Sequence, residues 1–399
     1  MSSERLLRIG ETGRAPMLGA NYVPSAGWFY SWLDFDADNA RRDFADLASI
    51  GLDHIRIFPI WPWIQPNRGL IRRRAVDDVL ALIDCAAEFD LAVAVDLLQG
   101  HLSSFDFVPS WLLTWHQASL FTDATARAGI KAYARAVAGE VSGRPNVFAI
   151  TLGNEVNNLW PANATTLEGT YDFTAELVET VRTAAPDVAC LTSFYDDVWY
   201  DPAHPFPQSA AVDLGDVTTV HSWTFNGVGG LDAPLGPATT THADYLVELA
   251  AAAGQPDRAV WLQEVGAAEP DIPPDTAAAF AHATIDAVRA NPALCGITWW
   301  CSHDIDPRLL DFPRREYSLG LFTVDHQRKP VADVLALAAN EPPTLPVARD
   351  SISCPVDPRD PATRDQLAPG SEFHRTWTHR RQSGPVAILP PSRSSAVAS

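Results

Sequence analysis

Basic residues are scarce in this sequence, and lysine occurs only at Lys131 and Lys329. The 399 residues include 29 Lys and Arg against 49 Asp and Glu, which leaves a formal net charge of −20 at pH 7. A surface this negative repels phosphate backbones and anionic lipid headgroups, so we expect neither a nucleic-acid nor a membrane-surface partner. With 47% hydrophobic and 20% charged residues, the chain is too apolar for a disordered protein. Its length suits one large or two ordinary domains.

Long apolar runs and paired cysteines are also missing. No segment reaches the roughly 18–20 apolar residues that a membrane helix needs. Residues 1–16 lack the apolar block of a secretory signal, so we expect a short cap segment there. Five cysteines without a Cys-x-x-Cys pair predict buried thiols rather than a disulfide framework or a zinc site. These features favour a cytoplasmic protein, and we expect no metal or other cofactor.

Short apolar runs alternate along the chain with longer amphipathic segments. The runs are nearly continuous in hydrophobicity, which is typical of parallel strands covered on both faces. They span residues 18–22, 54–58, 91–97, 147–152, 188–194, 217–221, 259–263 and 296–300. Helical patterns span residues 38–50, 76–89, 124–141, 170–184, 242–253, 276–290 and 331–339. Eight strands, each followed by a helix or its remnant, predict a closed (β/α)8 or TIM barrel over about residues 17–340.

Three other segments complete the predicted organisation. A doubly wound open sheet would need a glycine-rich phosphate turn after the first strand, and residues 19–24 offer none. Residues 195–213 are irregular and rich in proline, so the fifth helix is expected to be short or displaced. Residues 341–399 form a C-terminal extension that we expect to be largely irregular, and mostly disordered from about residue 369.

Two glutamates close predicted strands of the barrel. Active sites of such barrels lie at the C-terminal ends of the strands. Glu155 follows the fourth run and Glu264 follows the seventh, so the two side chains can face one another across the barrel mouth. At a separation of about 5–5.5 Å, one carboxylate can attack an anomeric carbon while the other protonates the leaving oxygen. Salt-bridged or metal-binding carboxylates are the alternative interpretation.

Tryptophan is unusually frequent, with 13 residues. Eleven of them lie at predicted strand ends or in the loops that follow: Trp28, Trp32, Trp61, Trp63, Trp111, Trp115, Trp160, Trp199, Trp223, Trp299 and Trp300. Aromatic rings offer flat apolar faces to the C–H faces of pyranoses. Core packing alone predicts no preference for one end of a barrel, and a cation–π cage leaves the paired glutamates unexplained. We expect most of these rings, taken singly, to pack rather than to touch a ligand.

The polar residues at the strand ends resemble those of clan A glycoside hydrolases, most closely glycoside hydrolase family 5, the cellulase and mannanase family. The resemblance covers about residues 17–340 and rests on Arg56, Asn154, Glu155, His221, Glu264 and Trp300. It implies retaining hydrolysis of a β-glycoside, with Glu155 as general acid/base and Glu264 as nucleophile. It also implies that Asn154 binds the sugar 2-hydroxyl and that Arg56 keeps the nucleophile ionised. His221 would join the hydrogen bonds around both carboxylates, and Trp300 would form the floor of the −1 subsite.

The sequence departs from the family pattern at two strand ends. The third strand ends in residues 99–101, which places His101 where the family usually has His-Asn. Trp299 precedes Trp300, so either ring could stack on the sugar, although Trp300 matches the family better. The stretches 27–33 and 299–304 are similar to bacterial β-mannosidases that act on short mannosides such as the mannose–N-acetylglucosamine core. Asp304 is a further candidate for sugar recognition.

Large aromatic loops favour exo action on a short oligosaccharide, because rings such as Trp63 and Trp115 could wall the cleft into a pocket. An endo-β-1,4-glucanase or mannanase of the same family is the first alternative. A barrel that binds sugar without cleaving it is another. A metal-dependent hydrolase could use His101, His221 and Asp304, but the first strand lacks the His-x-His pair that such enzymes usually carry. The sequence leaves the oligomeric state open.

Overall fold

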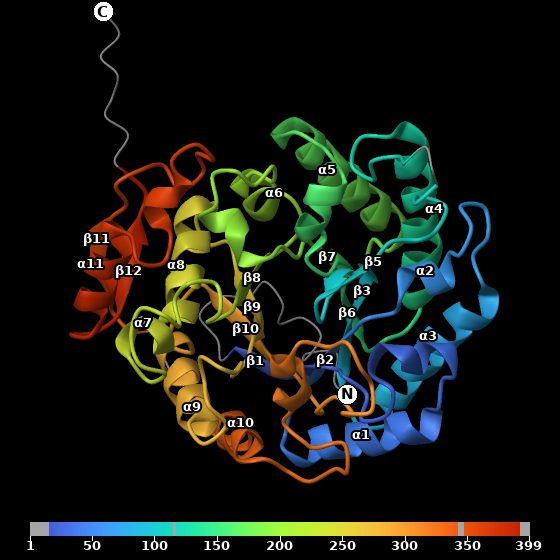
Figure 1. Cartoon of the computed structure of the whole chain (residues 1–399), viewed down its shortest axis with the longest axis horizontal. Helices are drawn as coiled ribbons and strands as arrows, with labels where there is room; N and C mark the ends of the chain where they lie inside the picture. The colour runs from blue at the N-terminus through green and yellow to red at the C-terminus, as the bar shows by residue number, and fades with distance from the viewer. Residues whose placement is uncertain (1–15, 115–116, 342–346, 392–399) are drawn as a thin grey trace, which may run out of the picture.

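The computed structural model describes residues 16–114, 117–341 and 347–391, and within them eight parallel strands form one sheet (Figure 1). These are β1 (Met17–Asn21), β2 (His54–Ile57), β3 (Ala92–Leu98), β6 (Val147–Gly153), β7 (Ala189–Leu191), β8 (Thr218–Ser222), β9 (Val260–Val265) and β10 (Leu294–Trp299). The hydrogen-bonded order β7-β6-β3-β2-β1-β10-β9-β8 is that of a barrel open only between β7 and β8. Isolated side-chain hydrogen bonds cross that gap. In one of them, Thr219 Oγ1 donates to the Thr192 carbonyl at 2.8 Å. The predicted (β/α)8 barrel is confirmed.

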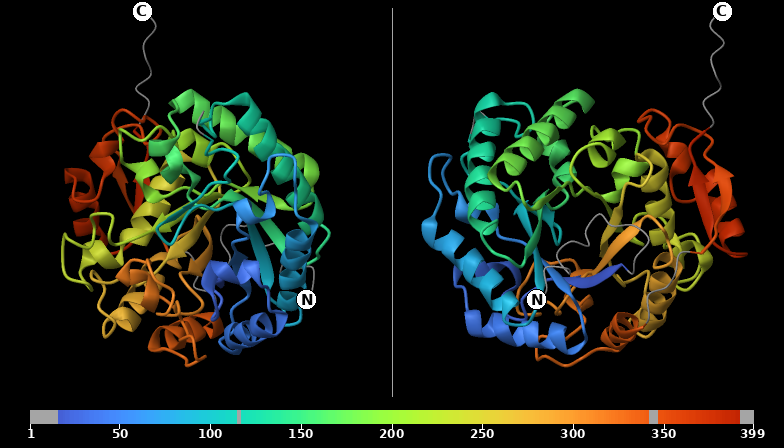
Figure 2. Two further views of the ribbon diagram at one scale, coloured as in Figure 1. Left: turned by 45° about the vertical axis from the view of Figure 1, so that its right-hand side comes forward. Right: turned by 180° about the vertical axis from the view of Figure 1, so that it is seen from behind.

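Helices cover the outside of the barrel (Figure 2). The long ones are α1 (Ala37–Ser49), α3 (Arg73–Ala87), α4 (Ala124–Val141), α5 (Leu167–Ala184), α8 (His242–Ala253), α9 (Ala277–Val288) and α10 (Pro330–Asn340). Side-chain caps start three of them, because Asp36, Asp123 and Thr166 each accept a hydrogen bond from a backbone N–H of the first turn. After β7, the helix is reduced to a 3-10 turn at Asp196–Trp199 and the short α6 (Gln208–Val212), as residues 195–213 predicted.

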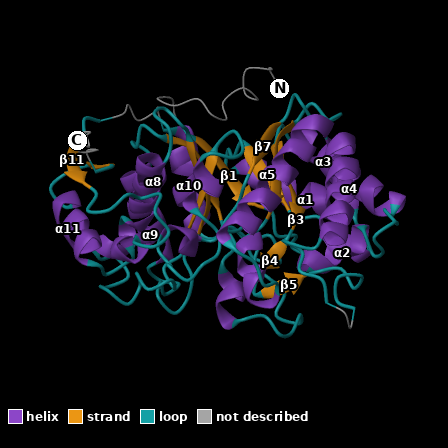
Figure 3. Cartoon of the chain, turned by 90° about the horizontal axis from the view of Figure 1, so that it is seen from above, coloured by secondary structure: helices purple, strands orange, loops and turns teal. Residues whose placement is uncertain are grey.

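Shorter elements decorate the loops. Helices α2 (Trp61–Ile64) and α7 (Pro237–Thr240) precede α3 and α8, and further 3-10 turns span Trp28–Leu33, Val156–Ala162, Arg314–Ser318 and Arg364–Leu367. An antiparallel hairpin of β4 (Gly100–Leu102) and β5 (Phe105–Phe107) follows β3. Figure 3 shows this hairpin beyond one end of the barrel strands. It therefore lies where the strands deliver their C-terminal residues.

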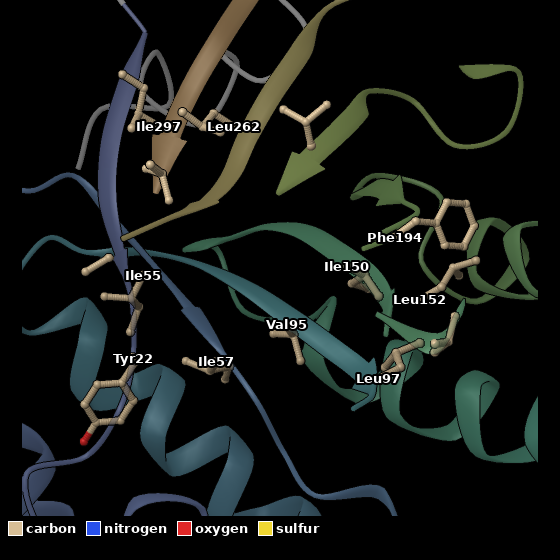
Figure 4. Close-up of a cluster of buried hydrophobic side chains, with 14 of the residues drawn as sticks. Tyr22, Ile55, Ile57, Val95, Leu97, Ile150, Leu152, Phe194, Leu262 and Ile297 are labelled. Carbon is tan, nitrogen blue, oxygen red and sulfur yellow. The ribbon is translucent and has the colours of Figure 1, made fainter. Parts of the chain in front are cut away.

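Alternation along the strands separates the apolar core from the polar interior of the barrel. Ile55, Ile57, Val95 and Leu97 belong to the hydrophobic cluster between the strands and the helices (Figure 4). Their neighbours Arg56 and Asp96 therefore point to the opposite face, into the barrel. Parallel strands that read as continuous apolar runs thus still present charged groups at their C-terminal ends.

The C-terminal extension is ordered where disorder was expected. Strands β11 (Asp350–Ser353) and β12 (Val386–Leu389) pair in parallel, and α11 (Glu372–Arg381) packs with them beside α8 (Figure 2). Trp377 is fully buried there, 5.1 Å from the ring of Tyr245. The predicted disorder was therefore wrong for residues 369–391. A few apolar side chains are buried against α8, and the free energy of that burial is enough to order the segment. Residues 1–15, most of the predicted cap, lie outside the described residues, as do 392–399.

All five cysteines are buried, and no disulfide joins them in the described structure. None of the helices that the structure describes is long and apolar enough to cross a membrane.

Candidate active site

Arg56 is the centre of the polar network inside the barrel mouth. Its guanidinium is fully buried and forms a bidentate pair with Asp96, at 2.9 and 2.7 Å. The same group donates to Glu264 Oε1 at 2.7 Å and to Asn154 Oδ1 at 2.5 Å. Burial opposes the charge, but Asp96 and Glu264 together raise the pKa of Arg56. One permanent cation therefore orients side chains from β9, from β3 and from the end of β6.

A β-bulge aims Glu264 into the cleft. Val220 pairs with Leu262 and His221 pairs with Glu264, so β9 carries one more residue than β8 at this point. The ladder with β10 shifts at the same place. Bulges of this kind bend a strand and redirect a side chain, and they are common beside active sites. Without the extra residue, the side chains of Gln263 and Glu264 would point to opposite faces of the sheet, as successive residues of a regular strand do.

Glu155 stands at the end of β6 in a strained backbone conformation. Its φ of 46° and ψ of 40° are left-handed, which costs a residue other than glycine roughly 1–2 kcal/mol. Asn158 Nδ2 donates to Glu155 Oε2 at 3.2 Å, and His221 Nδ1 lies 2.6 Å from Oε1. Glycine at position 100 lets the β4–β5 hairpin pack closely against the backbone that precedes Glu155, since a Cβ there would lie 2.6 Å from the Asn154 carbonyl oxygen.

The two glutamates lie close together and share one imidazole. A carboxylate oxygen of Glu155 and one of Glu264 are within 4.8 Å of each other, and His221 Nδ1 lies 3.3 Å from Glu264 Oε2. Trp223 Nε1 also donates to Glu264 Oε2 at 3.2 Å. Burial raises the pKa of Glu155 to about 8 and that of Glu264 to about 7. For Glu264, the charge of Glu155 also raises the pKa, while His221 and Arg56 oppose the rise.

These carboxylates open into a cleft of about 510 Å³. That volume lies in the range of small-ligand sites, about 300–1,000 Å³. Of the tryptophans that the structure describes, Trp300, Trp223 and Trp160 line it, together with His101 and Asn154. Burial works against a charge on His101, but its contact with Asp106, at 2.9 Å, raises the pKa of His101. The cleft therefore combines aromatic faces with titratable groups.

Other predicted binding residues lie elsewhere. Trp299 belongs to the core between barrel and helices, which corrects its assignment and leaves Trp300 as the ring in the cleft. Asp304 does not line the cleft, because it accepts from Lys329 Nζ at 2.7 Å and from the Gly320 N–H. Trp63 stacks on Tyr30 and packs against the hydrophobic cluster that contains Trp300. Trp115 lies outside the described residues.

Several residues of the cleft and of the hydrogen-bond network beneath it were missed from the sequence. Asp96 and Gln263 lie within strands that read as apolar runs. Glu316 lines the cleft from the 3-10 turn at Arg314–Ser318, far along a loop with no periodic signal. It is buried, and burial raises its pKa to about 7. Its Oε2 has no hydrogen-bond partner among the described residues.

A metal is poorly accommodated by this set. Glu155, His221 and Glu264 have ligand-like spacing, but Arg56 donates to Glu264 and would repel a cation there. The trio of the metal-dependent alternative does not converge, because Asp304 is engaged by Lys329 outside the cleft. The geometry instead suits a reaction that uses two carboxyl groups of different protonation.

Solved structures resemble this chain closely, whereas no protein-family model and no curated protein matches it. A GH5_18 protein of Streptomyces cattleya, with one glutamate replaced by alanine and with Manβ1-4GlcNAc bound, is 43% identical. The match covers 96% of this chain and 95% of that one, with a TM-score of 0.91. A GH5_18 variant of Bifidobacterium longum subsp. longum in complex with the same disaccharide is 38% identical over 96% of this chain and 92% of that one, with a TM-score of 0.90.

A more distant structure shares the fold. It is the exo-β-1,4-mannosidase Op5Man5 of an Opitutaceae bacterium, at 24% identity and a TM-score of 0.78, with 95% of this chain and 70% of that one covered. The barrel, the paired glutamates and the closer relatives define the chain as a glycoside hydrolase of family 5. Within this family it belongs to subfamily 18, GH5_18.

Proposed function

We propose that this enzyme is an exo-acting β-mannosidase that hydrolyses short β-1,4-linked mannosides with retention of configuration. The observation that carries the proposal is the approach of a Glu155 oxygen and a Glu264 oxygen to within 4.8 Å. A retaining pair is about 5–5.5 Å apart, whereas an inverting pair needs about 6.5–9.5 Å to leave room for water. The disaccharide bound by the Streptomyces and Bifidobacterium relatives, Manβ1-4GlcNAc, supports the substrate class.

In the first step Glu264 attacks the anomeric carbon and the glycosidic C–O bond breaks. The proton of Glu155 passes to the leaving oxygen, so the reducing-end sugar departs as a neutral alcohol. Water then attacks the anomeric carbon from the face that the leaving group vacated, and Glu155 takes one of its protons. Glu264 leaves as a carboxylate, and the product has the configuration of the substrate.

The hydrogen bonds around His221 favour a proton on Glu155 at rest. Thr151 Oγ1 accepts from Gln263 Nε2, which leaves Gln263 Oε1 facing His221 Nε2 at 3.2 Å. Burial lowers the pKa of His221, which favours the neutral ring, and in the neutral ring Nε2 can donate to Gln263 Oε1. The Nδ1 lone pair then faces Glu155 Oε1 at 2.6 Å, a contact in which a protonated Glu155 can be the donor.

The remaining side chains position the sugar. One Asn154 Nδ2 hydrogen is given to the His101 carbonyl at 2.6 Å, and the other is available for the 2-hydroxyl of the bound sugar. Trp300 is held edge-on by Trp28 and Trp223, with ring centroids at 6.2 Å in both cases. Its face can therefore serve as a rigid floor for an apolar sugar face.

The pH dependence of kcat/KM tests the assignment of the two glutamates. Activity requires ionised Glu264, so it rises with pH through a pKa near 7, and it requires protonated Glu155, so it falls through a pKa near 8. We expect a narrow bell between those values. Burial is the main reason for the high pKa of Glu155 and the charge of Asp196 adds to it, so Asp196→Asn should move the alkaline limb to lower pH. An alkaline limb that stays in place would contradict that assignment.

Glu316 is expected to bind a substrate hydroxyl, because its unpartnered Oε2 is buried at the cleft. A hydrogen bond to a charged group is worth about 1.5–3 kcal/mol, so Glu316→Gln should lower kcat/KM for a disaccharide by about 10- to 100-fold. The loss should fall mainly on KM. The control is Glu179→Gln, on the exposed side of α5. An unchanged KM would contradict the contact.

A panel of substrates tests exo action and sugar choice. The β4–β5 hairpin, Trp160 and the Arg315–Glu316 turn wall the cleft, which supports a pocket for short chains. We expect turnover of p-nitrophenyl β-mannoside and of Manβ1-4GlcNAc, and little chain cleavage of mannan or cellulose. Rapid loss of viscosity in mannan would instead favour the endo-mannanase alternative. Binding of the disaccharide without any turnover would favour a non-catalytic barrel.

The cytoplasmic location of the protein stays a prediction.

A further inference from the structure

A second cluster of titratable side chains lies outside the cleft. Asp43 and Asp46 belong to α1, His303 follows β10, and His326 lies in the loop before α10. His303 Nε2 and His326 Nδ1 lie 3.2 and 2.7 Å from Asp46 Oδ2. The same two nitrogens lie 3.7 and 3.9 Å from Asp43 Oδ1. Each of the two histidine nitrogens therefore lies within 4 Å of an oxygen of both aspartates, and ligand atoms of Asp43, His303 and His326 lie within 4.8 Å of one another.

One oxygen of this cluster is buried and unused. Asp43 Oδ2 accepts from the Tyr22 hydroxyl at 2.8 Å, the Ser25 N–H at 3.1 Å and Asn39 Nδ2 at 3.1 Å. These donors fix the carboxylate so that Oδ1 faces the histidines. Oδ1 has no hydrogen-bond partner among the described residues, and Asp43 is fully buried. Burying such an oxygen unpaired costs free energy, so the geometry calls for an occupant.

We propose that Asp43, His303 and His326, with Asp46 beside them, bind a divalent transition-metal ion of the zinc class. Zn–N and Zn–O bonds of about 2.0–2.2 Å in a tetrahedron separate the ligand atoms by roughly 3.3–3.6 Å. The four nitrogen–oxygen separations, 2.7 to 3.9 Å, bracket that spacing. Two carboxylates balance the charge of the ion, and neutral imidazoles complete a donor set that suits zinc.

The surroundings match those of a protein metal site. The donors to Asp43 Oδ2 supply the outer hydrogen bonds that usually orient a ligating carboxylate. The side chains of Asp46 and His326 are 22% and 30% exposed, so an ion can enter from one side. The bound ion would tie α1, beside the first strand, to the loops after the last strand. This site departs from the expectation of no metal, because its ligands come from positions with no common spacing in the sequence.

Zinc binding by the full-length protein tests the site. The purified chain is stripped with EDTA, dialysed against zinc, and analysed for metal by mass spectrometry. We expect about one zinc per chain, and a Tm that EDTA lowers and zinc restores. Asp43→Asn keeps the shape of the side chain and an acceptor oxygen but turns Oδ1 into an amide nitrogen, so it should abolish binding. His326→Gln, in a partly exposed loop, should do the same.

Two control variants should keep the zinc. His282→Ala removes an exposed histidine that pairs with Asp286 on α9, and Glu264→Gln alters the catalytic cleft. Cobalt(II) added to the stripped wild-type chain should give the visible absorption of a tetrahedral site, a readout that does not depend on variants. No zinc above the content of Asp43→Asn, or no change in Tm and no cobalt spectrum in the wild type, would overturn the proposal.

Discussion

Glu264→Gln should lower kcat for an aryl β-mannoside by at least about a thousandfold, as the loss of a nucleophile does in other enzymes. The amide has the size of the carboxylate but cannot form the glycosyl ester. Arg56 keeps its bidentate pair with Asp96, so the fold around the barrel mouth should survive the change. The measurement is the initial rate on p-nitrophenyl β-mannoside, with thermal unfolding to verify that the variant is folded.

Glu179→Gln makes the same chemical change on the exposed side of α5 and should leave the rate unaltered. A Glu264→Gln enzyme that is folded and retains more than a few per cent of the wild-type rate would reject Glu264 as the nucleophile.

Glu155→Ala should have the second largest effect, and it should depend on the leaving group. General acid–base catalysis contributes typically about 10²- to 10⁴-fold, so cleavage of Manβ1-4GlcNAc should fall by that factor. A nitrophenolate leaves without a proton, so its release should suffer much less. The glycosyl-enzyme then persists, because no base activates water. Azide needs no base, and it can enter the space that the glutamate vacates, so it should restore turnover and yield the β-mannosyl azide.

The product anomer is the decisive readout of this experiment, since a β-azide requires two displacements at the same carbon. The same azide treatment should leave Glu264→Gln inactive, because no glycosyl-enzyme forms in that variant. Full activity of Glu155→Ala without azide would exclude Glu155 as the acid/base. An α-azide would contradict the double displacement.

The fold was predictable because the chain repeats one unit. Each buried parallel strand reads as a short apolar run, and each helix carries one apolar stripe, so the eight strands of the barrel stand out in sequence. Helices α4 and α8 have the bounds that their patterns predict. The C-terminal extension lacks such a repeat, and its order depends on Trp377, Val386 and Ile388 meeting α8 in three dimensions.

The site was predictable to the extent that strand ends identify it. Arg56, Asn154, Glu155, His221, Glu264 and Trp300 meet in the structure as the resemblance implied. Asp96 was missed because a single charge inside an apolar strand looks like an exception until Arg56 is placed beside it. The bulge at Glu264 cannot be read from one strand, since it exists only relative to β8 and β10. Glu316 comes from a loop, where side-chain direction follows no period.

The stereochemistry of the first product tests the central claim most directly. Proton NMR of the anomeric signal, recorded before mutarotation, distinguishes β-mannose from α-mannose as Manβ1-4GlcNAc is cleaved. If Glu264 attacks and Glu155 serves in turn as acid and base, the first mannose released carries the β configuration. Initial release of α-mannose would mean a single displacement by water, and the two carboxyl groups would then need roles other than those assigned to them.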